Sequence, residues 1–267
     1  MIKALILAAA VATTPASPLS PQAQALIAPV HNAIVKARAE LAALPPPKDD
    51  TEKLVRMQKL EQAPRAVIQI DMTSLSPEEK ARAWAAIWAE ITPIDEANQA
   101  ALLAMLPPEG WFTISKYGKD GSTAAFLIIQ HSNLDLWRRF TPVLEKLALK
   151  GEVRGAEYAL MYDRLALNEH RPQRYGSQMI CKAGKYVPDT LEDPEHIDQR
   201  RATLGMIPYK DYLAMFADDP PCWRLPRAAA APLWRRRKGG AKHPCPSCPT
   251  SRSSNGRPGS PGPDARR

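Results

Sequence analysis

Residues 121–131 read GSTAAFLIIQH, a run that is apolar on every side from Ala124 to Ile129 and turns polar at its end. We interpret this segment as a buried helix, because a helix that is apolar all round lies inside a protein core. A strand is the alternative for so short a run. Helical patterns on both sides of the segment favour the helix, and with it a mainly α-helical fold.

The segments after this run also have a helical pattern, interrupted once. Between 173 and 187 the helical period fails, and short apolar runs around Lys182-Ala183-Gly184-Lys185 indicate a small β-hairpin. The first downstream helix contains Pro142, which predicts a kink or a split there. The downstream helices are predicted at 134–149, 154–168, 193–205 and 208–216.

Prolines divide the segments before the run. An amphipathic stripe predicts a helix from Leu26 that ends at Pro45-Pro46-Pro47, because proline lacks the N–H donor that a helix needs. A shorter helix follows at about 51–62. Ser76-Pro77-Glu78-Glu79 is a strong helix start, with a serine cap and a glutamate that reaches back to it. Thr92-Pro93 repeats the start signal, which predicts a separate second helix that runs to about Met105.

The ends of the chain differ in composition from its middle. Lys3, the apolar residues 4–12 and Ala23-Gln24-Ala25 form the three parts of a signal peptide, with Thr14-Pro15-Ala16 as a second cleavage site. Nine apolar residues are too few to span a bilayer, so we expect no transmembrane span after cleavage. The predicted address is periplasmic or extracellular. The predicted organisation is a signal peptide at 1–25, an N-terminal helical arm at 26–50, a helical domain at 51–220 and a disordered tail at 221–267.

The positive charge of the chain belongs to the tail. Its 36 Lys and Arg and 28 Asp and Glu give a net charge of +8, but residues 223–267 alone hold 11 basic residues and one acid. Residues 1–222 therefore carry −2, which argues against nucleic acid as a partner of the folded body. The tail is rich in Pro, Gly, Ala, Arg and Ser and is either a native disordered extension or an out-of-frame reading of the gene end.

The cysteines do not define a metal site. Cys245 and Cys248 form a CxxC with His243 upstream, which is three ligands where structural zinc needs four. We predict no metal and no cofactor. Cys181 and Cys222 are either a disulfide or two separate small core residues.

Two polar residues interrupt apolar helix faces and are the candidate catalytic pair. His131 continues the face of Leu127 and Ile128, and Asp163 falls between Leu160 and Leu167. A buried carboxylate needs a partner, and a His–Asp pair would make the imidazole a general base oriented by the acid. The alternative is structural: Asp163 caps backbone groups or pairs with an arginine, and His131 is a satisfied core residue.

A donor-rich segment completes the candidate site. Residues 171–178 read RPQRYGSQ, where Gly176 allows close backbone approach or positive φ. This segment either binds a polar ligand or is only a turn that enters the hairpin. Arg201 either clamps an anion with Arg200 or pairs with Asp163. The candidate ligand-binding residues are Trp111, Gln130, Arg164, Gln173, Tyr175, Gln178, Arg200 and Arg201.

These residues resemble those of a bacterial domain of unknown function, six-six-two-four (DUF6624), over about Leu54 to Tyr212. The resemblance rests on Glu61-Gln62 with Arg65, Asp95 with Asn98, Gly110-Trp111, Gln130-His131, Asp163-Arg164, Gln173-x-Tyr175-Gly176-Ser177-Gln178, and Arg200-Arg201 before Gly205. It implies a secreted or lipid-anchored protein whose His131, Asp163, Arg164, Gln173, Tyr175, Gln178 and Arg201 converge. Phe112, Asn133 and Ser177 depart from the usual Pro, acid and Thr of the family. The resemblance implies no reaction.

The sequence thus predicts an exported domain with a polar cluster that binds a polar ligand or an envelope protein, or that braces the helices. The alternative is an envelope hydrolase or transferase in which His131 is the general acid/base and Asp163 orients it. No GxSxG, Walker, GxGxxG or HExxH motif occurs. Whether the protein is an enzyme stays open at this level.

Overall fold

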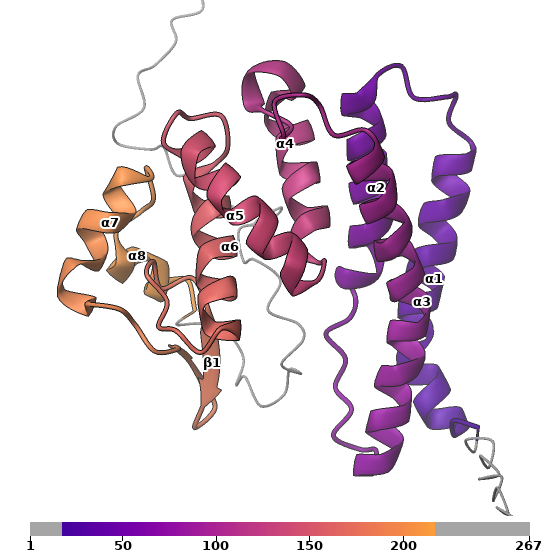
Figure 1. Cartoon of the computed structure of the whole chain (residues 1–267). Helices are drawn as coiled ribbons and strands as arrows, with labels where there is room; N and C mark the ends of the chain where they lie inside the picture. Colours follow the sequence, from indigo (N-terminus) through magenta and orange to yellow (C-terminus); the bar gives the residue numbers. More distant parts are fainter. Residues whose placement is uncertain (1–17, 217–267) are drawn as a thin grey trace, which may run out of the picture. The chain divides into compact units, whose positions relative to one another are not determined.

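The computed structural model describes residues 18–216, which form eight α-helices, one short 3-10 helix and one two-stranded antiparallel hairpin (Figure 1). The predicted mainly α-helical fold with a small hairpin is confirmed. The predicted signal sequence as far as residue 17 and the tail from residue 217 lie outside the described residues. The elements are α1 (Pro21–Ala42), α2 (Asp50–Arg65), α3 (Pro77–Ala104), α4 (Ile114–Gln130), α5 (Leu134–Ala148), α6 (Gly155–Asn168), β1 (Met179–Lys182), β2 (Lys185–Pro188), η1 (Pro194–His196), α7 (Ile197–Thr203) and α8 (Tyr209–Ala214).

Helices α1, α2 and α3 pack along one another (Figure 1). Each begins at a side-chain cap, since Ser20 Oγ, Asp49 Oδ1 and Ser76 Oγ each accept a hydrogen bond from a backbone N–H in the first turn. The segment predicted as an N-terminal arm is therefore a packed member of this group. Its shared core consists of Ala23, Val30, Ile34, Ile68, Ile70, Met72, Leu75, Ala83, Ile87, Ile91 and Ile94.

The prediction of two helices on either side of Pro93 is wrong. Helix α3 runs without a break across Pro93. Proline costs the helix one backbone hydrogen bond, but Ile87, Ile91 and Ile94 stay on one buried face only if the helix continues. The burial of this face outweighs the local cost of the proline. Pro142 is likewise accommodated inside a continuous α5.

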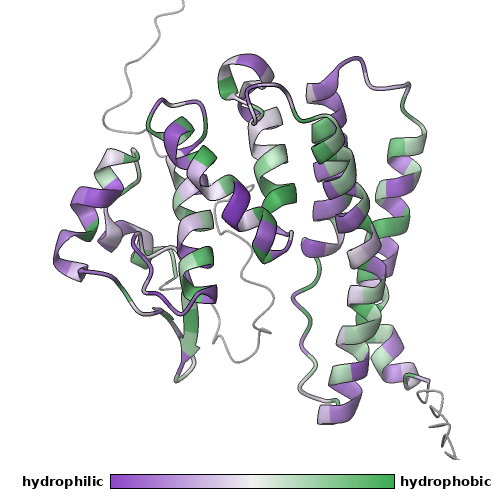
Figure 2. Ribbon diagram, in the orientation of Figure 1, coloured by the Kyte–Doolittle hydropathy of each residue, from purple (hydrophilic) through white to green (hydrophobic). Residues whose placement is uncertain are grey.

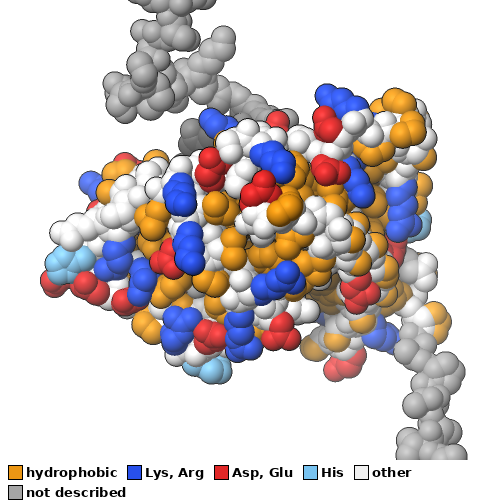
Figure 3. Space-filling view, turned by 45° about the horizontal axis from the view of Figure 1, so that its top comes forward, with side chains coloured by type: hydrophobic (Ala, Val, Ile, Leu, Met, Phe, Trp, Pro, Cys, Tyr) orange, Lys and Arg blue, Asp and Glu red, His pale blue; other side chains and the backbone are white. Residues whose placement is uncertain are grey.

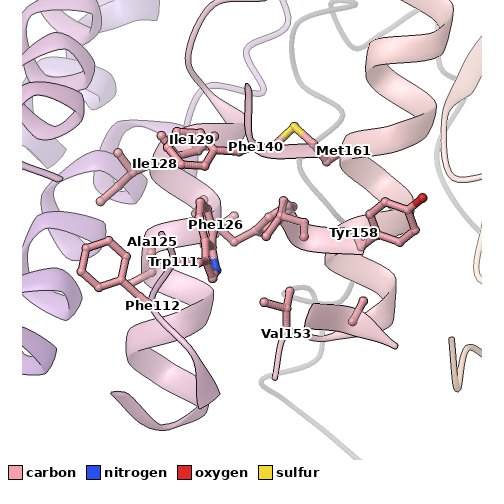
Figure 4. Close-up of a cluster of buried hydrophobic side chains, with 14 of the residues drawn as sticks. Trp111, Phe112, Ala125, Phe126, Ile128, Ile129, Phe140, Val153, Tyr158 and Met161 are labelled. Carbon is pink, nitrogen blue, oxygen red and sulfur yellow. The ribbon is translucent and has the colours of Figure 1, made fainter. Parts of the chain in front are cut away.

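The 121–131 segment is the second part of α4, and it is buried as predicted. Every residue of α4 from Gly121 to Gln130 is buried, and the helix turns at Gly118, whose φ is +65°. Trp111 lies in the core beside α4, 5.1 Å from Phe140 between ring centroids (Figure 4). The hydropathy colouring shows the apolar residues of α4 (Figure 2). The predicted ligand contact by Trp111 has no support here, because its side chain is fully buried as a core residue.

The chain after α6 returns to it through the loop at 174–177, which hydrogen-bonds to Asp163, and through Leu204, which lies against Gly155. Strand β1 pairs with β2 from Met179 opposite Pro188 to Lys182 opposite Lys185. The two turn residues between them, Ala183 and Gly184, both have positive φ, as a tight two-residue hairpin requires. Cys181 of β1 is disulfide-bonded.

The helices between residues 18 and 216 all lack the combination of length and hydropathy needed to cross a bilayer.

Candidate functional site

The predicted site residues other than Trp111 fall into two separate clusters. The first surrounds the end of α4 and includes Gln130, His131 and Arg164. The second surrounds Asp163 and includes Gln173, Tyr175, Gln178, Arg200 and Arg201. The expected convergence of all these residues on one site is therefore wrong, and the two clusters have different chemistry.

His131 lies at the C-terminal end of α4 and contacts Glu61 of α2. The imidazole Nδ1 of His131 and the carboxylate Oε1 of Glu61 are in hydrogen-bond contact. The Glu61 side chain is 1% exposed, whereas 17% of the His131 side chain is accessible to solvent. The carboxylate thus lies behind the imidazole, and the imidazole lies between it and the solvent.

Glu61 is held in its ionised form by its neighbours. Burial alone would raise the pKa of Glu61, but His131, Arg65 and Gln62 together lower it below its usual value. Arg65 Nη1 lies 3.1 Å from Glu61 Oε1, and Gln62 Nε2 donates to Oε2 at 2.8 Å. An ionised carboxylate only accepts hydrogen bonds, so the shared proton belongs to Nδ1 of His131.

The Nδ1–H tautomer leaves Nε2 of His131 with a free lone pair. Burial lowers the pKa of His131, and the positive charges of Arg65 and Arg164 add to this effect, while Glu61 opposes it. The imidazole is therefore neutral at pH 7, and Nε2 is a proton acceptor. A neutral imidazole oriented by a carboxylate at its other nitrogen is the arrangement that general-base catalysis uses.

Arg65 connects the pair to α3. Its guanidinium donates from Nη1 to Asp95 Oδ1 at 3.0 Å and from Nη2 to Oδ2 at 2.6 Å, a two-pronged contact that fixes its plane. Asn98, one turn further along α3, donates to the carbonyl of Met57 at 3.1 Å. These bonds hold α2 against α3 and position Glu61 for His131.

Arg164 of α6 reaches the same end of α4. Its Nη1 donates to the carbonyl of Gln130 at 3.1 Å. With the Gln130 side-chain oxygen turned toward it, that oxygen accepts from Nη1 and Nη2 at 3.3 and 3.2 Å. The guanidinium also lies 5.7 Å from the centre of the Trp137 ring. Burial and the charge of Arg65 lower the pKa of Arg164 to about 10.

The predicted pairing of Asp163 with His131 is wrong. Asp163 is fully buried, and its carboxylate accepts three backbone N–H bonds, from Arg174 and Tyr175 at Oδ1 and from Ser177 at Oδ2, at 2.7, 3.0 and 2.9 Å. Asp163 caps the loop at 174–177, and the residue that contacts the imidazole is Glu61. The structural alternative for Asp163, a cap for backbone groups, is the one the structure has.

Gln173 and Arg201 of the second cluster also bind backbone, whereas the Gln178 side chain donates to Ser177 Oγ at 3.2 Å and the Tyr175 ring packs against those of Tyr158 and Tyr162. Gln173 donates from Nε2 to the carbonyls of Gln178 and Asp189 and accepts from the Gln178 N–H. Arg201 donates to the carbonyls of Tyr175 and Ile207 and does not pair with Asp163. These side chains donate their hydrogen bonds to backbone carbonyls and so hold the 173–178 segment in place.

Arg200 and Gly176 also have structural roles in this cluster. Arg200 donates to the carbonyls of Arg174, Glu192 and Asp193 and pairs with the Asp193 carboxylate at 3.4 Å, so its donors serve contacts within the chain and not the predicted anion clamp. Gly176 has φ of +68°, and a Cβ there would lie 2.5 Å from Cε2 of Tyr209. Both of the reasons predicted for a glycine at 176, close approach and positive φ, therefore apply.

Glu61, Arg65 and Asp95 are absent from the candidate residues predicted from the sequence. A signal existed, because Asp95 directly follows Ile91 and Ile94 on the buried face of α3 and needs a partner there. Arg65 lies one turn after Glu61 on a helix with few apolar residues, so nothing local showed that this turn is buried. Within residues 18–216, no group of three His, Cys, Asp or Glu side chains is arranged to hold a metal ion.

Comparison with known proteins identifies the family of the chain. No curated protein and no solved structure matches the chain significantly. A family model described as a family of unknown function, DUF6624, matches residues 48–221, which include both clusters. This match covers more than half of the chain, and the chain therefore belongs to the DUF6624 family.

Proposed function

We propose that Glu61 and His131 form a proton-transfer site in which Nε2 of His131 is the general acid/base for a hydrolase or transferase. The observation that carries the proposal is the contact between the buried Glu61 carboxylate and Nδ1 of the partly exposed His131. Glu61 is thus the carboxylate that orients the imidazole for general-base catalysis, and it belongs to α2, whereas the predicted partner Asp163 belongs to α6.

The different exposure of the two clusters supports this assignment. Asp163 is fully buried and its hydrogen bonds go to backbone, which suits a structural role. His131 keeps 17% of its side chain accessible. Within residues 18–216 the ring hydrogen bond of His131 is made by Nδ1. A base needs part of its ring within reach of a substrate, and the exposed fraction of the side chain provides this.

The reacting group comes from outside the protein in this proposal. Among residues 18–216, no Ser, Thr or Cys side chain hydrogen-bonds to the His131 ring. Nε2 would take a proton from a water molecule or a substrate hydroxyl and return it to the leaving group. Binding of a polar ligand without chemistry is the second candidate, and the lack of a hydrogen-bonded nucleophile favours it.

The address we propose is outside the cytoplasm. The disulfide at Cys181 supports it, because disulfides persist in oxidising compartments. Basic and acidic side chains are interleaved on the face shown in Figure 3, which supports a small polar substrate over nucleic acid. The substrate would then be a polar component of the cell envelope.

The test compares two histidine variants of the full chain on a panel of ester, phosphoester and amide substrates. His31 also contacts a glutamate through Nδ1, at 2.9 Å from Glu90, but its side chain is 59% exposed. His131→Asn should lower any observed turnover by about a hundredfold or more, and His31→Asn should leave it unchanged. Equal loss in both variants, or no turnover on any substrate, contradicts the catalytic proposal and leaves ligand binding.

A further inference from the structure

We propose that Arg164 binds an anionic group of the ligand, a carboxylate or a phosphate, beside the imidazole of His131. This inference rests on the proposed function, because it names the class of molecule that the same site would take. It concerns a residue on α6 whose guanidinium reaches the end of α4.

The two arginines of the site differ in their partners. Arg65 faces two carboxylates, those of Glu61 and Asp95. Within residues 18–216, the Arg164 guanidinium hydrogen-bonds only to the oxygens of Gln130, which are uncharged. Arg164 is half-buried. A half-buried guanidinium with no counter-charge is costly, and an anionic ligand would supply that charge.

The charges around Arg164 also favour an anionic ligand. Burial, followed by repulsion from Arg65, lowers the pKa of Arg164 to about 10. The charge of Arg164 in turn contributes to the lowered pKa of His131. An anion next to Arg164 would relieve the repulsion and would stabilise the protonated imidazole.

The guanidinium is held in place before any ligand arrives. Gln130 oxygens fix one edge of the guanidinium, and its face lies over the Trp137 ring, 5.7 Å from the ring centre. Trp137 is itself fixed, because its Nε1 donates to the carbonyl of Ile129 at 3.1 Å. A planar guanidinium with five donors and a fixed orientation suits two-pronged binding of a carboxylate or phosphate.

An anion bound at Arg164 would lie near the proposed catalytic residue His131. Gln130, whose carbonyl accepts from Arg164, directly precedes His131. The charge of Arg164 also acts on the His131 imidazole. A substrate held by its anionic group at Arg164 would therefore lie beside that ring. The shared chemistry of carboxylate and phosphate leaves two ligand sources, which the experiment separates.

The experiment titrates the full chain with inorganic phosphate and, separately, with acetate, and follows the His131 ring signals by NMR. We expect saturable binding of at least one of the two anions, together with a rise in the pKa of His131 on binding. Tighter binding of phosphate indicates a phosphorylated ligand, and tighter binding of acetate indicates a carboxylate ligand. No saturable change with either anion overturns the inference.

Variants separate this inference from the proposed function. Arg164→Met should raise the dissociation constant by about tenfold or more. Arg138→Met is the matched control, because Arg138 is 51% exposed and pairs with Asp135 and Glu169 on the surface. Glu61→Gln should keep anion binding while it impairs proton transfer. Anion binding that is unaltered in Arg164→Met contradicts the inference, and the rise in the His131 pKa tests it in the unmodified protein if that variant does not fold.

Discussion

Glu61 and His131 are 70 positions apart in the chain, yet the carboxylate of one contacts Nδ1 of the other. Glu61 lies in the last two turns of α2, and His131 caps α4. The pairing therefore depends on how α2 packs against α4, and the bond from Arg65 to Asp95 of α3 adds a third helix to the same arrangement. Three helices thus position one imidazole.

Asp163→Asn should destabilise the fold without touching the imidazole. The asparagine would lose the negative charge that three backbone N–H groups share, and its amide nitrogen would face one of those donors. We expect a loss of more than about 2 kcal/mol in the free energy of unfolding, measured by urea titration. Asp135→Asn is the control, since that side chain is 90% exposed. A loss as small as in the control would mean that the buried carboxylate does not brace the loop.

Gly176→Ala should cost more than Gly110→Ala, although both residues have positive φ. A Cβ at 176 would lie 2.5 Å from Tyr209 Cε2, whereas a Cβ at 110 meets nothing within 4 Å. Both variants pay about 1 kcal/mol for the left-handed backbone, and the clash adds about 1–3 kcal/mol at 176 alone. Thermal unfolding of the two variants measures the difference. Equal melting temperatures would show that Tyr209 moves aside freely.

Glu157 should make the fold less stable as the pH rises from 4.5 to 7. Burial raises the pKa of Glu157 from 4.5 to about 7, against the opposing hydrogen bond from Thr123 Oγ1 and the charge of Arg154. In this window the folded state holds a proton that the unfolded state has released, so stability present at low pH is lost, up to about 3 kcal/mol. Urea titrations at several pH values should show this slope, and Glu157→Gln should remove it. The same slope in both proteins would assign it to other groups.

We propose that the chain is exported, and its mature N-terminus should then be Ser17, not Leu26. Cleavage after Ala25 would remove the first turn of α1, including the buried Ala23 and the Ser20 cap, whose N–H also donates to Glu79. Cleavage after Ala16 leaves the whole helix. Mass spectrometry of the exported chain identifies the terminus, and a mature protein that begins at Leu26 would contradict this prediction.

Local signals were enough to predict most of the helices and the hairpin. Ser76 and Pro77 marked the start of α3, and a Gly in a two-residue turn marked the hairpin. The continuity of α3 across Pro93 could not be predicted, because it depends on burial of a face against α1 and α2. Propensity is a local quantity, and tertiary packing overrode it there.

The candidate site was predicted in part for the same reason. His131 and Asp163 stood out because each interrupts an apolar face, and both are indeed linked to buried polar contacts. Their partners could not be predicted, since Glu61 belongs to a distant helix and the partners of Asp163 are backbone N–H groups, which carry no sequence signal. Asp163 was predicted as the partner of His131 because both interrupt apolar helix faces. The actual partner depends on the packing of α2 on α4, which the sequence pattern does not show.

A pH titration of the His131 ring by nitrogen and carbon NMR, in the full chain and in Glu61→Gln, measures whether Glu61 orients the imidazole. We expect the Nδ1–H tautomer and a pKa below the usual 6.5 in the unaltered protein, because the effect of burial on the His131 pKa outweighs that of Glu61. In Glu61→Gln the carboxylate no longer raises this pKa, so it should fall further and the tautomer preference should be lost. A His131 that titrates above 6.5 with its proton on Nε2, or that is the same in both proteins, would contradict the account.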